Sequence, residues 1–179
     1  MKKLLTLCFL VFTGMELFAQ NGVGAWKLDV SAGYAKPTEG FGVKPGVTFV
    51  LEPHVFAAPN LAVGLRLEGA FLGYQAQSDE ELFSFFGSTC VTGDYYFSHR
   101  GVKPFMGMGF GLYTRHDVYL DTEYDNDDLV YSEYGAVKLG FLGRAGIEFG
   151  HLKLMAAYNV IGANFSYAGF TIGYTVGGL

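Results

Sequence analysis

Seven carboxylates concentrated near residues 117–133 are the side chains of this chain that most resemble a metal site. They are Asp117, Asp121, Glu123, Asp125, Asp127, Asp128 and Glu133. Four of them alternate along the chain: Asp121, Glu123, Asp125 and Asp127. Their oxygens could converge on Ca²⁺, but Asn126 stands where the EF-hand loop needs glycine and Ser132 where it needs a bidentate glutamate. We therefore expect a solvated surface loop without a resident metal ion, and weak divalent-cation binding is the alternative.

A second polar run, Arg115-His116-Asp117, could belong to an acid–base site with Ser132 as its nucleophile. No strained nucleophile turn surrounds the serine, and such runs are common where a strand meets a loop. The glycine-rich segment 107–111 lacks the following helix that would bind a phosphate at its N-terminus. We therefore predict no enzymatic activity and no cofactor.

The first nineteen residues have the organisation of a cleaved secretory signal peptide. Lys2 and Lys3 form a positive segment, residues 4–13 an apolar one, and cleavage is expected after Ala19. The mature domain is then 20–179, with 10 basic and 16 acidic residues and a net charge of −6, which argues against nucleic acid as a partner. It keeps one cysteine, Cys90, so an internal disulfide is excluded.

The composition favours strands. The chain has 26 Gly, 17 Phe and 12 Tyr, and half of its residues are hydrophobic. After residue 20 no segment approaches the ~18 uncharged apolar residues of a transmembrane helix. A chain of 179 residues is consistent with one domain.

Hydrophobic side chains alternate with small or polar ones over unusually long segments. Residues 61–71 and 137–149 both repeat with period two, beyond the five or six residues of an average strand. The same pattern predicts eight strands: Trp26–Lys36, Val43–Pro53, Leu61–Tyr74, Phe83–Phe97, Val102–Tyr113, Tyr134–Phe149, Leu152–Ile161 and Tyr167–Val176. The expected fold is all-β, an eight-stranded antiparallel up-and-down transmembrane β-barrel.

The lengths of the connections support this topology. The second, fourth and sixth should be short periplasmic turns, and they fall at Pro53–Asn60, Ser98–Gly101 and Gly150–His151. The fifth, Thr114–Glu133, is the longest and the most acidic. Short connections on one side and long ones on the other are typical of outer-membrane barrels.

A membrane barrel of this size should turn its ionised side chains inward. An eight-stranded barrel encloses just enough space for side chains to fill it, and charges of both signs can pair there. The residues that fall on inward positions are predicted to form a lumen polar network: Arg66, Glu68, Asp94, Lys138, Arg144, Glu148 and Lys153. Cys90 is expected inside as well, beside Ser88 and Thr92.

Several motifs resemble the outer-membrane protein β-barrel domain family, the small barrels of the OmpA and OmpX kind. They are Lys103-Pro104-Phe105 with Gly107, Gly109, Gly111 and Tyr113, then Arg144-Ala145-Gly146-Ile147-Glu148-Phe149, and the closing Gly169-Phe170-Thr171-Ile172-Gly173-Tyr174. The resemblance implies insertion into the outer membrane of a Gram-negative bacterium. Such barrels commonly end on an aromatic residue, and here we expect Tyr174 to take that role.

The predicted function is that of a monomeric outer-membrane barrel with a structural or surface-interaction role. Its partners would be outer-membrane lipid and an extracellular ligand held by the loops at 75–82 and 114–133. The alternatives are a narrow, porin-like channel for ions or small solutes, an outer-membrane lipid-modifying enzyme, and a soluble lipocalin-like barrel. The residues alone do not decide between a pore and a plugged barrel.

Overall fold

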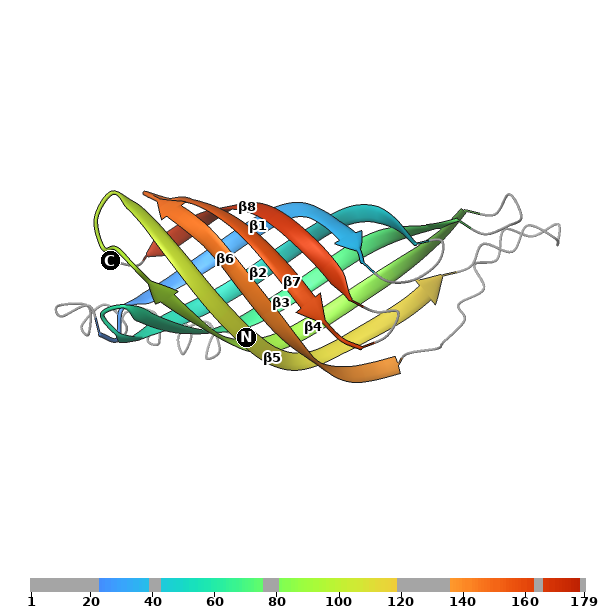
Figure 1. Ribbon diagram of the computed structural model, residues 1–179, viewed down its shortest axis with the longest axis horizontal. Helices are drawn as coiled ribbons and strands as arrows, with labels where there is room; N and C mark the ends of the chain where they lie inside the picture. The colour runs from blue at the N-terminus through green and yellow to red at the C-terminus, as the bar shows by residue number, and fades with distance from the viewer. Residues whose placement is uncertain (1–22, 39–42, 76–80, 119–135, 163–165, 178–179) are drawn as a thin grey trace, which may run out of the picture.

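The strands form one closed antiparallel barrel in which each pairs with its neighbours in the chain and β1 closes against β8 (Figure 1). The computed structural model describes residues 23–38, 43–75, 81–118, 136–162 and 166–177. The strands are β1 Trp26–Pro37, β2 Val43–Ala58, β3 Leu61–Gln75, β4 Glu81–Tyr96, β5 Val102–Val118, β6 Ala136–Phe149, β7 Leu152–Val160 and β8 Tyr167–Gly177. The predicted fold class is confirmed. Among the described residues no helix has the length and apolar character needed to cross a membrane.

Two strands run five residues further than the sequence pattern predicts. β2 continues through Pro53 to Ala58, so the second connection shrinks to residues 59–60. Proline has no amide hydrogen to donate, and the ladder between β2 and β3 leaves out Pro53 while its pairing with Leu28 of β1 is kept. β5 continues to Val118 because it stays paired with β4, which places Arg115 and His116 in a strand.

The two ends of the barrel differ. We call the end that holds the β2–β3, β4–β5 and β6–β7 connections the turn end, and the opposite one the loop end. The start of β1 and the finish of β8 are paired at the turn end, Lys27 against Gly177. Both ends of the described barrel chain therefore lie on the turn side, as an even number of strands requires.

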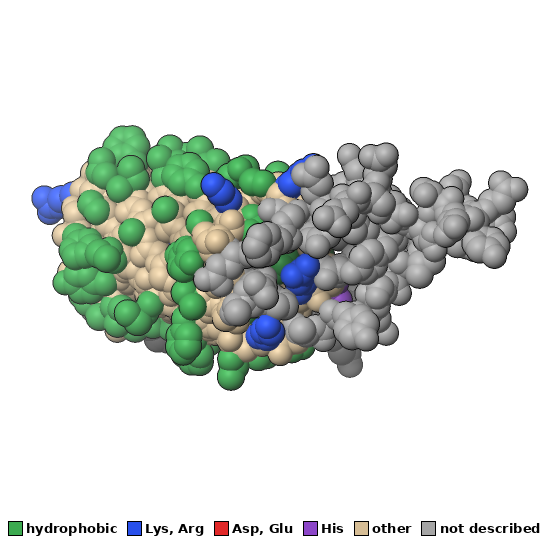
Figure 2. Space-filling model, turned by 45° about the vertical axis from the view of Figure 1, so that its right-hand side comes forward, with side chains coloured by type: hydrophobic (Ala, Val, Ile, Leu, Met, Phe, Trp, Pro, Cys, Tyr) green, Lys and Arg blue, Asp and Glu red, His purple; other side chains and the backbone are tan. Residues whose placement is uncertain are grey.

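Side chains alternate between the two faces of the wall along every strand. Large apolar side chains on the outer face stay exposed, among them Val30, Phe49, Leu67, Phe110, Leu139 and Ile172. In Figure 2 hydrophobic side chains are spread over the visible barrel wall, no acidic side chain is seen on it, and most of the Lys and Arg side chains in view lie toward the loop end. The barrel is thus apolar outside, the reverse of a water-soluble domain.

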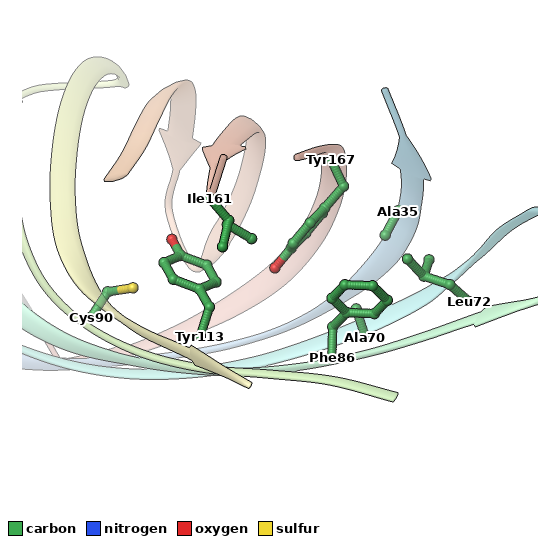
Figure 3. Packing of buried hydrophobic residues seen from close by; sticks show 8 residues of the cluster. All are labelled: Ala35, Ala70, Leu72, Phe86, Cys90, Tyr113, Ile161 and Tyr167. Atoms are coloured by element: carbon green, nitrogen blue, oxygen red, sulfur yellow. The ribbon is translucent and has the colours of Figure 1, made fainter. Parts of the chain in front are cut away.

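Two apolar layers close the interior. The layer toward the loop end contains Ala35, Ala70, Leu72, Phe86, Cys90, Tyr113, Ile161 and Tyr167, which point into the barrel in Figure 3. The layer toward the turn end contains Ala25, Phe56, Ala62, Tyr96, Phe105 and Met155. Most of the ionised side chains of the interior lie between these layers.

The hairpin between β6 and β7 depends on a residue that adopts a positive φ. Gly150 has φ 56°, a left-handed conformation that costs an L-residue about 1–2 kcal/mol. We expect Gly150→Ala to lower the free energy of unfolding by about 1 kcal/mol, measured by urea titration of the protein in lipid vesicles. Gly143→Ala is the control, because its Cβ would point into open space on the outer face of β6. Equal stability of both variants would contradict the assigned turn.

Candidate functional site in the barrel lumen

Arg144 is the centre of an ionic network inside the barrel. Its Nη1 and Nη2 donate to the two carboxylate oxygens of Glu52, each at 2.7 Å, and its Nε donates to Oδ1 of Asp94 at 2.7 Å. All three side chains are buried. A guanidinium presents its donors in a rigid planar fork, so one arginine on β6 fixes carboxylates of β2 and β4 across the lumen.

A second arginine extends the network toward the loop end. Arg66 on β3 donates from Nε to Glu68 at 3.0 Å, and its Nη2 lies 3.0 Å from the same oxygen. The other carboxylate oxygen of Glu68 accepts from the Thr48 hydroxyl at 2.9 Å, and the Nη1 atom of Arg66 lies 3.6 Å from Glu52. The Thr48 hydroxyl thus donates to the Glu68 oxygen that Arg66 does not contact.

Two lysines occupy the turn side of the lumen. The ammonium of Lys153 donates to Asp29 at 2.6 Å, and that of Lys27 donates to Glu148 at 2.8 Å and to the hydroxyl of Tyr96. These ammonium groups also lie over the rings of the apolar layer below, Lys153 at 4.5 Å from the centroid of Phe105. The lysines therefore connect the ionic network to that layer through cation–π contacts.

His54 and Asp29 complete the network. His54 Nε2 lies 3.0 Å from Asp29 Oδ2 and 3.7 Å from Glu52 Oε2. The other oxygen of Asp29 accepts from the Thr175 hydroxyl at 2.7 Å. Across the described interior, five buried carboxylates (Asp29, Glu52, Glu68, Asp94 and Glu148) face four buried cations (Lys27, Arg66, Arg144 and Lys153). Lys103, a little exposed at the turn end, lies 3.5 Å from Glu148 and adds a fifth cation.

Glycine provides the space that these long side chains occupy. A Cβ on Gly107 would lie 2.0 Å from Asp94 Oδ1 and 3.1 Å from Arg144 Nε. A Cβ on Gly64 would lie 2.7 Å from the His54 ring. Inward glycines therefore lie where the side chains of the network cross the lumen.

The structure places the predicted lumen residues as follows. Six are buried in the interior: Arg66, Glu68, Asp94, Arg144, Glu148 and Lys153. Lys138 is half-buried near the loop end of β6, where it pairs in register with Tyr113. The prediction omitted Lys27, Asp29, Glu52 and His54, which alternate with outward residues along β1 and β2. The same period-two pattern would have found them.

Most of the predicted chemical candidates fall outside the part of the chain that the structure describes. Asp121, Glu123, Asp125 and Asp127 lie outside the described residues, and so does Ser132. Arg115 lies 5.4 Å from the ring centroid of the inward Phe86, whereas the exposed His116, next to it on β5, belongs to the outer face. Adjacent strand residues point to opposite faces. Within the described segments no three His, Cys, Asp or Glu side chains are grouped to hold a metal ion.

Cys90 belongs to the loop-side apolar layer. It is fully buried as a free thiol, and Ser88 and Thr92 of the same strand are buried beside it (Figure 3). The Tyr113 hydroxyl, on the same side of the lumen, donates to Asn159 at 2.9 Å. The thiol is therefore a small packing group among rings, away from the solvent that a reactive cysteine needs.

No protein-family model matches this chain, and neither does any curated protein. Its fold is similar to solved outer-membrane structures. Neisserial surface protein A (NspA) shares 16% identity at a TM-score of 0.59, over 84% of this chain and 96% of that one. OprG, an outer membrane protein of Pseudomonas aeruginosa, shares 13% identity at 0.57, over 87% and 97%. Ail, the attachment invasion locus protein of Yersinia pestis, shares 13% at 0.52, over 84% and 98%. At these identities the likeness shows the fold, that of the small eight-stranded outer-membrane β-barrels.

Proposed function

We propose that this chain is an integral barrel of the Gram-negative outer membrane, exported by a cleaved signal peptide of residues 1–19, with a structural or surface-interaction role. One observation carries the proposal. The five carboxylates whose side chains the structure describes, Asp29, Glu52, Glu68, Asp94 and Glu148, are buried in the lumen, while large apolar side chains occupy the outer face of all eight strands. Such an arrangement is stable only where hydrocarbon surrounds the wall.

The outer face is too apolar for a soluble barrel. Monomeric soluble proteins expose apolar patches of a few hundred Å², whereas here the apolar side chains form a belt around the whole wall. A lipocalin-like barrel also needs an apolar interior to hold its ligand. The interior of this barrel is instead occupied by ion pairs, with Arg66 and Lys27 among its largest fully buried side chains.

The filled lumen favours a plugged barrel rather than a channel. Both apolar layers and the ionic network lie across the path that an ion would take. Moving an ion through would require breaking the paired contacts of Arg144 and displacing rings at each end. We propose no open pore and, since the polar candidates on β5 point to opposite faces, no catalysis.

The surface-interaction role rests on the loop end. The connection from β3 to β4, after Gln75, and the connection from β5 to β6, after Val118, are both on that side. They belong to the two segments that are predicted to hold an extracellular ligand. In an outer-membrane barrel with its chain ends in the periplasm, this end faces the exterior. Ail, one of the structural neighbours, is an attachment protein by name, and a comparable use of the loops is consistent with this architecture.

The membrane proposal predicts a specific behaviour on fractionation. The expressed chain should sediment with the outer membrane, resist extraction by carbonate, and migrate faster on an unheated detergent gel than after boiling. The reason is that a closed ladder has no free edge at which detergent can begin unfolding. Recovery in the soluble periplasmic fraction without detergent would contradict it.

The plug is tested separately with the purified barrel in planar bilayers. We expect no discrete conductance steps above background for the wild-type chain. The positive control for conductance is the double variant Arg144→Ala and Tyr96→Ala, which removes the centre of the ionic network and part of the turn-side apolar layer. Regular steps from the wild type would support the narrow channel instead.

A further inference from the structure

His54 is a titratable side chain enclosed in the ionic network of the lumen. Its ring has no solvent exposure. Histidine is the side chain whose charge ordinarily changes between about pH 5 and pH 8, whereas arginine, lysine and carboxylate side chains ordinarily keep one charge over that range. His54 is therefore the member of the network through which a moderate change of pH can act.

The position of the Nε2 atom indicates where the ring of His54 carries its hydrogen. Nε2 lies 3.0 Å from Asp29 Oδ2 and 3.7 Å from Glu52 Oε2. Both are carboxylate oxygens, which accept hydrogen bonds and repel a nitrogen lone pair. The hydrogen of the neutral ring is therefore on Nε2.

The other ring nitrogen, Nδ1, lies against Gly64 of β3. A Cβ on Gly64 would be 2.7 Å from Nδ1. Thr92 is close to the same glycine, and its hydroxyl donates to Glu52. Within the part of the chain that the structure describes, Nδ1 has no hydrogen-bond partner. A second proton on the ring would therefore occupy a buried nitrogen without an acceptor, which costs free energy.

The charges of the network are balanced without His54. They come from seven strands: Lys27 and Asp29 on β1, Glu52 on β2, Arg66 and Glu68 on β3, Asp94 on β4, Lys103 on β5, Arg144 and Glu148 on β6, and Lys153 on β7. Five of these groups are carboxylates and five are cations. The remaining strand, β8, contributes the hydroxyl of Thr175. An imidazolium would add a sixth positive charge to an enclosed volume that holds five negative ones.

A charged His54 would also compete for carboxylates that other cations already hold. Lys153 donates to the Asp29 oxygen that faces His54, at 2.6 Å, and Arg144 donates to the Glu52 oxygen that faces His54, at 2.7 Å. These contacts join β1 to β7 and β2 to β6 across the lumen. Weakening them would loosen the interior of the barrel.

We infer that His54 is uncharged in the folded barrel and that its protonation loosens the lumen network, which makes the interior an acid-sensitive switch. This goes beyond the proposed function, because the network is enclosed whatever surrounds the wall. The geometry of both ring nitrogens and the balance of charge support it independently.

The folded barrel should therefore become less stable as the pH falls. Unfolding exposes His54, which then takes up a proton in the ordinary range for histidine. The unfolded state binds more protons than the folded state, so acid favours unfolding. Between about pH 7.5 and about pH 5, this contribution should lower the folding equilibrium constant by about tenfold or more.

The test is urea unfolding of the mature chain in lipid vesicles at those two pH values. His54→Gln is the test variant, because its amide can donate to Asp29 and carries no charge at either pH. On acidification the folding equilibrium constant of the wild type should fall about tenfold further than that of His54→Gln. Titration of the other groups acts on both proteins, and the comparison removes it.

His116→Gln is the matched control, because His116 is exposed on the outer face of β5. It should keep the pH dependence of the wild type. The same pH dependence in the wild type and His54→Gln would overturn the inference, and so would a wild type that gains stability in acid relative to that variant. Loss of the pH dependence in His116→Gln would overturn it too, because the effect would then not belong to His54.

A second measurement applies even if His54→Gln does not fold, which heat-modifiable migration on a gel detects. Nitrogen-15 chemical shifts of the histidine-labelled wild type in detergent micelles distinguish a protonated ring nitrogen from an unprotonated one. Variants of the other three histidines, His99, His116 and His151, assign the His54 signals. At about pH 6 we expect hydrogen on Nε2 and none on Nδ1. Hydrogen on both nitrogens would contradict the assigned charge.

Discussion

Replacing Arg144 by methionine should destabilise the folded barrel by about 3–5 kcal/mol, the usual cost of removing one partner from a buried ionic cluster. The substitution keeps a long flexible side chain but leaves the carboxylates of Glu52 and Asp94 without the three contacts of 2.7 Å that now neutralise them. The measurement is urea unfolding in lipid vesicles, followed by the fluorescence of the single tryptophan, Trp26.

Two further variants identify the cause. Arg100→Met removes an exposed arginine from the turn between β4 and β5 and should change the stability by less than about 0.5 kcal/mol. Adding Glu52→Gln and Asp94→Asn to Arg144→Met should recover much of the loss, because no uncompensated charge then stays buried. A loss below about 1 kcal/mol in the single variant would show that water reaches the network.

Replacing Phe110 by arginine should oppose insertion of the barrel by about 2–4 kcal/mol, the cost of an outward cation at the bilayer midplane. Phe110 lies in the middle of β5, paired with Val91 and Phe141, and its ring points outward. We expect a smaller heat-modifiable fraction after refolding into vesicles and a lower urea midpoint. A soluble barrel would tolerate the same change and gain solubility.

Phe97→Arg is a closely matched control. Phe97 and Phe110 are equally exposed, at 59%, but Phe97 follows β4 at the turn end, where the cost falls to about 0–1 kcal/mol. A clear difference between the two variants therefore measures depth in a membrane. Equal and small effects would contradict the membrane assignment, whatever the gel behaviour of the wild type.

The barrel itself could be predicted from the residues because its signal is local. Alternation between Leu61 and Phe71 assigns each side chain to one face without knowledge of its neighbours, since strand geometry has a period of two. Tight turns such as Gly150-His151 then fix the order of pairing. The same local rule placed Arg66, Glu68 and Arg144 toward the interior.

Partners across the lumen could not be predicted this way. Arg144 contacts Glu52, 92 positions earlier, and Lys153 contacts Asp29, 124 positions earlier. These distances depend on strand tilt and on the stagger between strands, which alternation along one strand does not encode. The predicted end of β2 at Pro53 was wrong for a related reason. Pairing with β1 outweighed the local preference of proline to end a strand.

By itself, the sequence determined which face of each strand is apolar, because that information is carried by adjacent residues. Only the tertiary structure decided that the interior is closed by two apolar layers, and that Arg144 contacts Glu52 and Asp94 between them. Both features arise when eight strands close on one another, so that residues far apart in the chain compete for the same small volume.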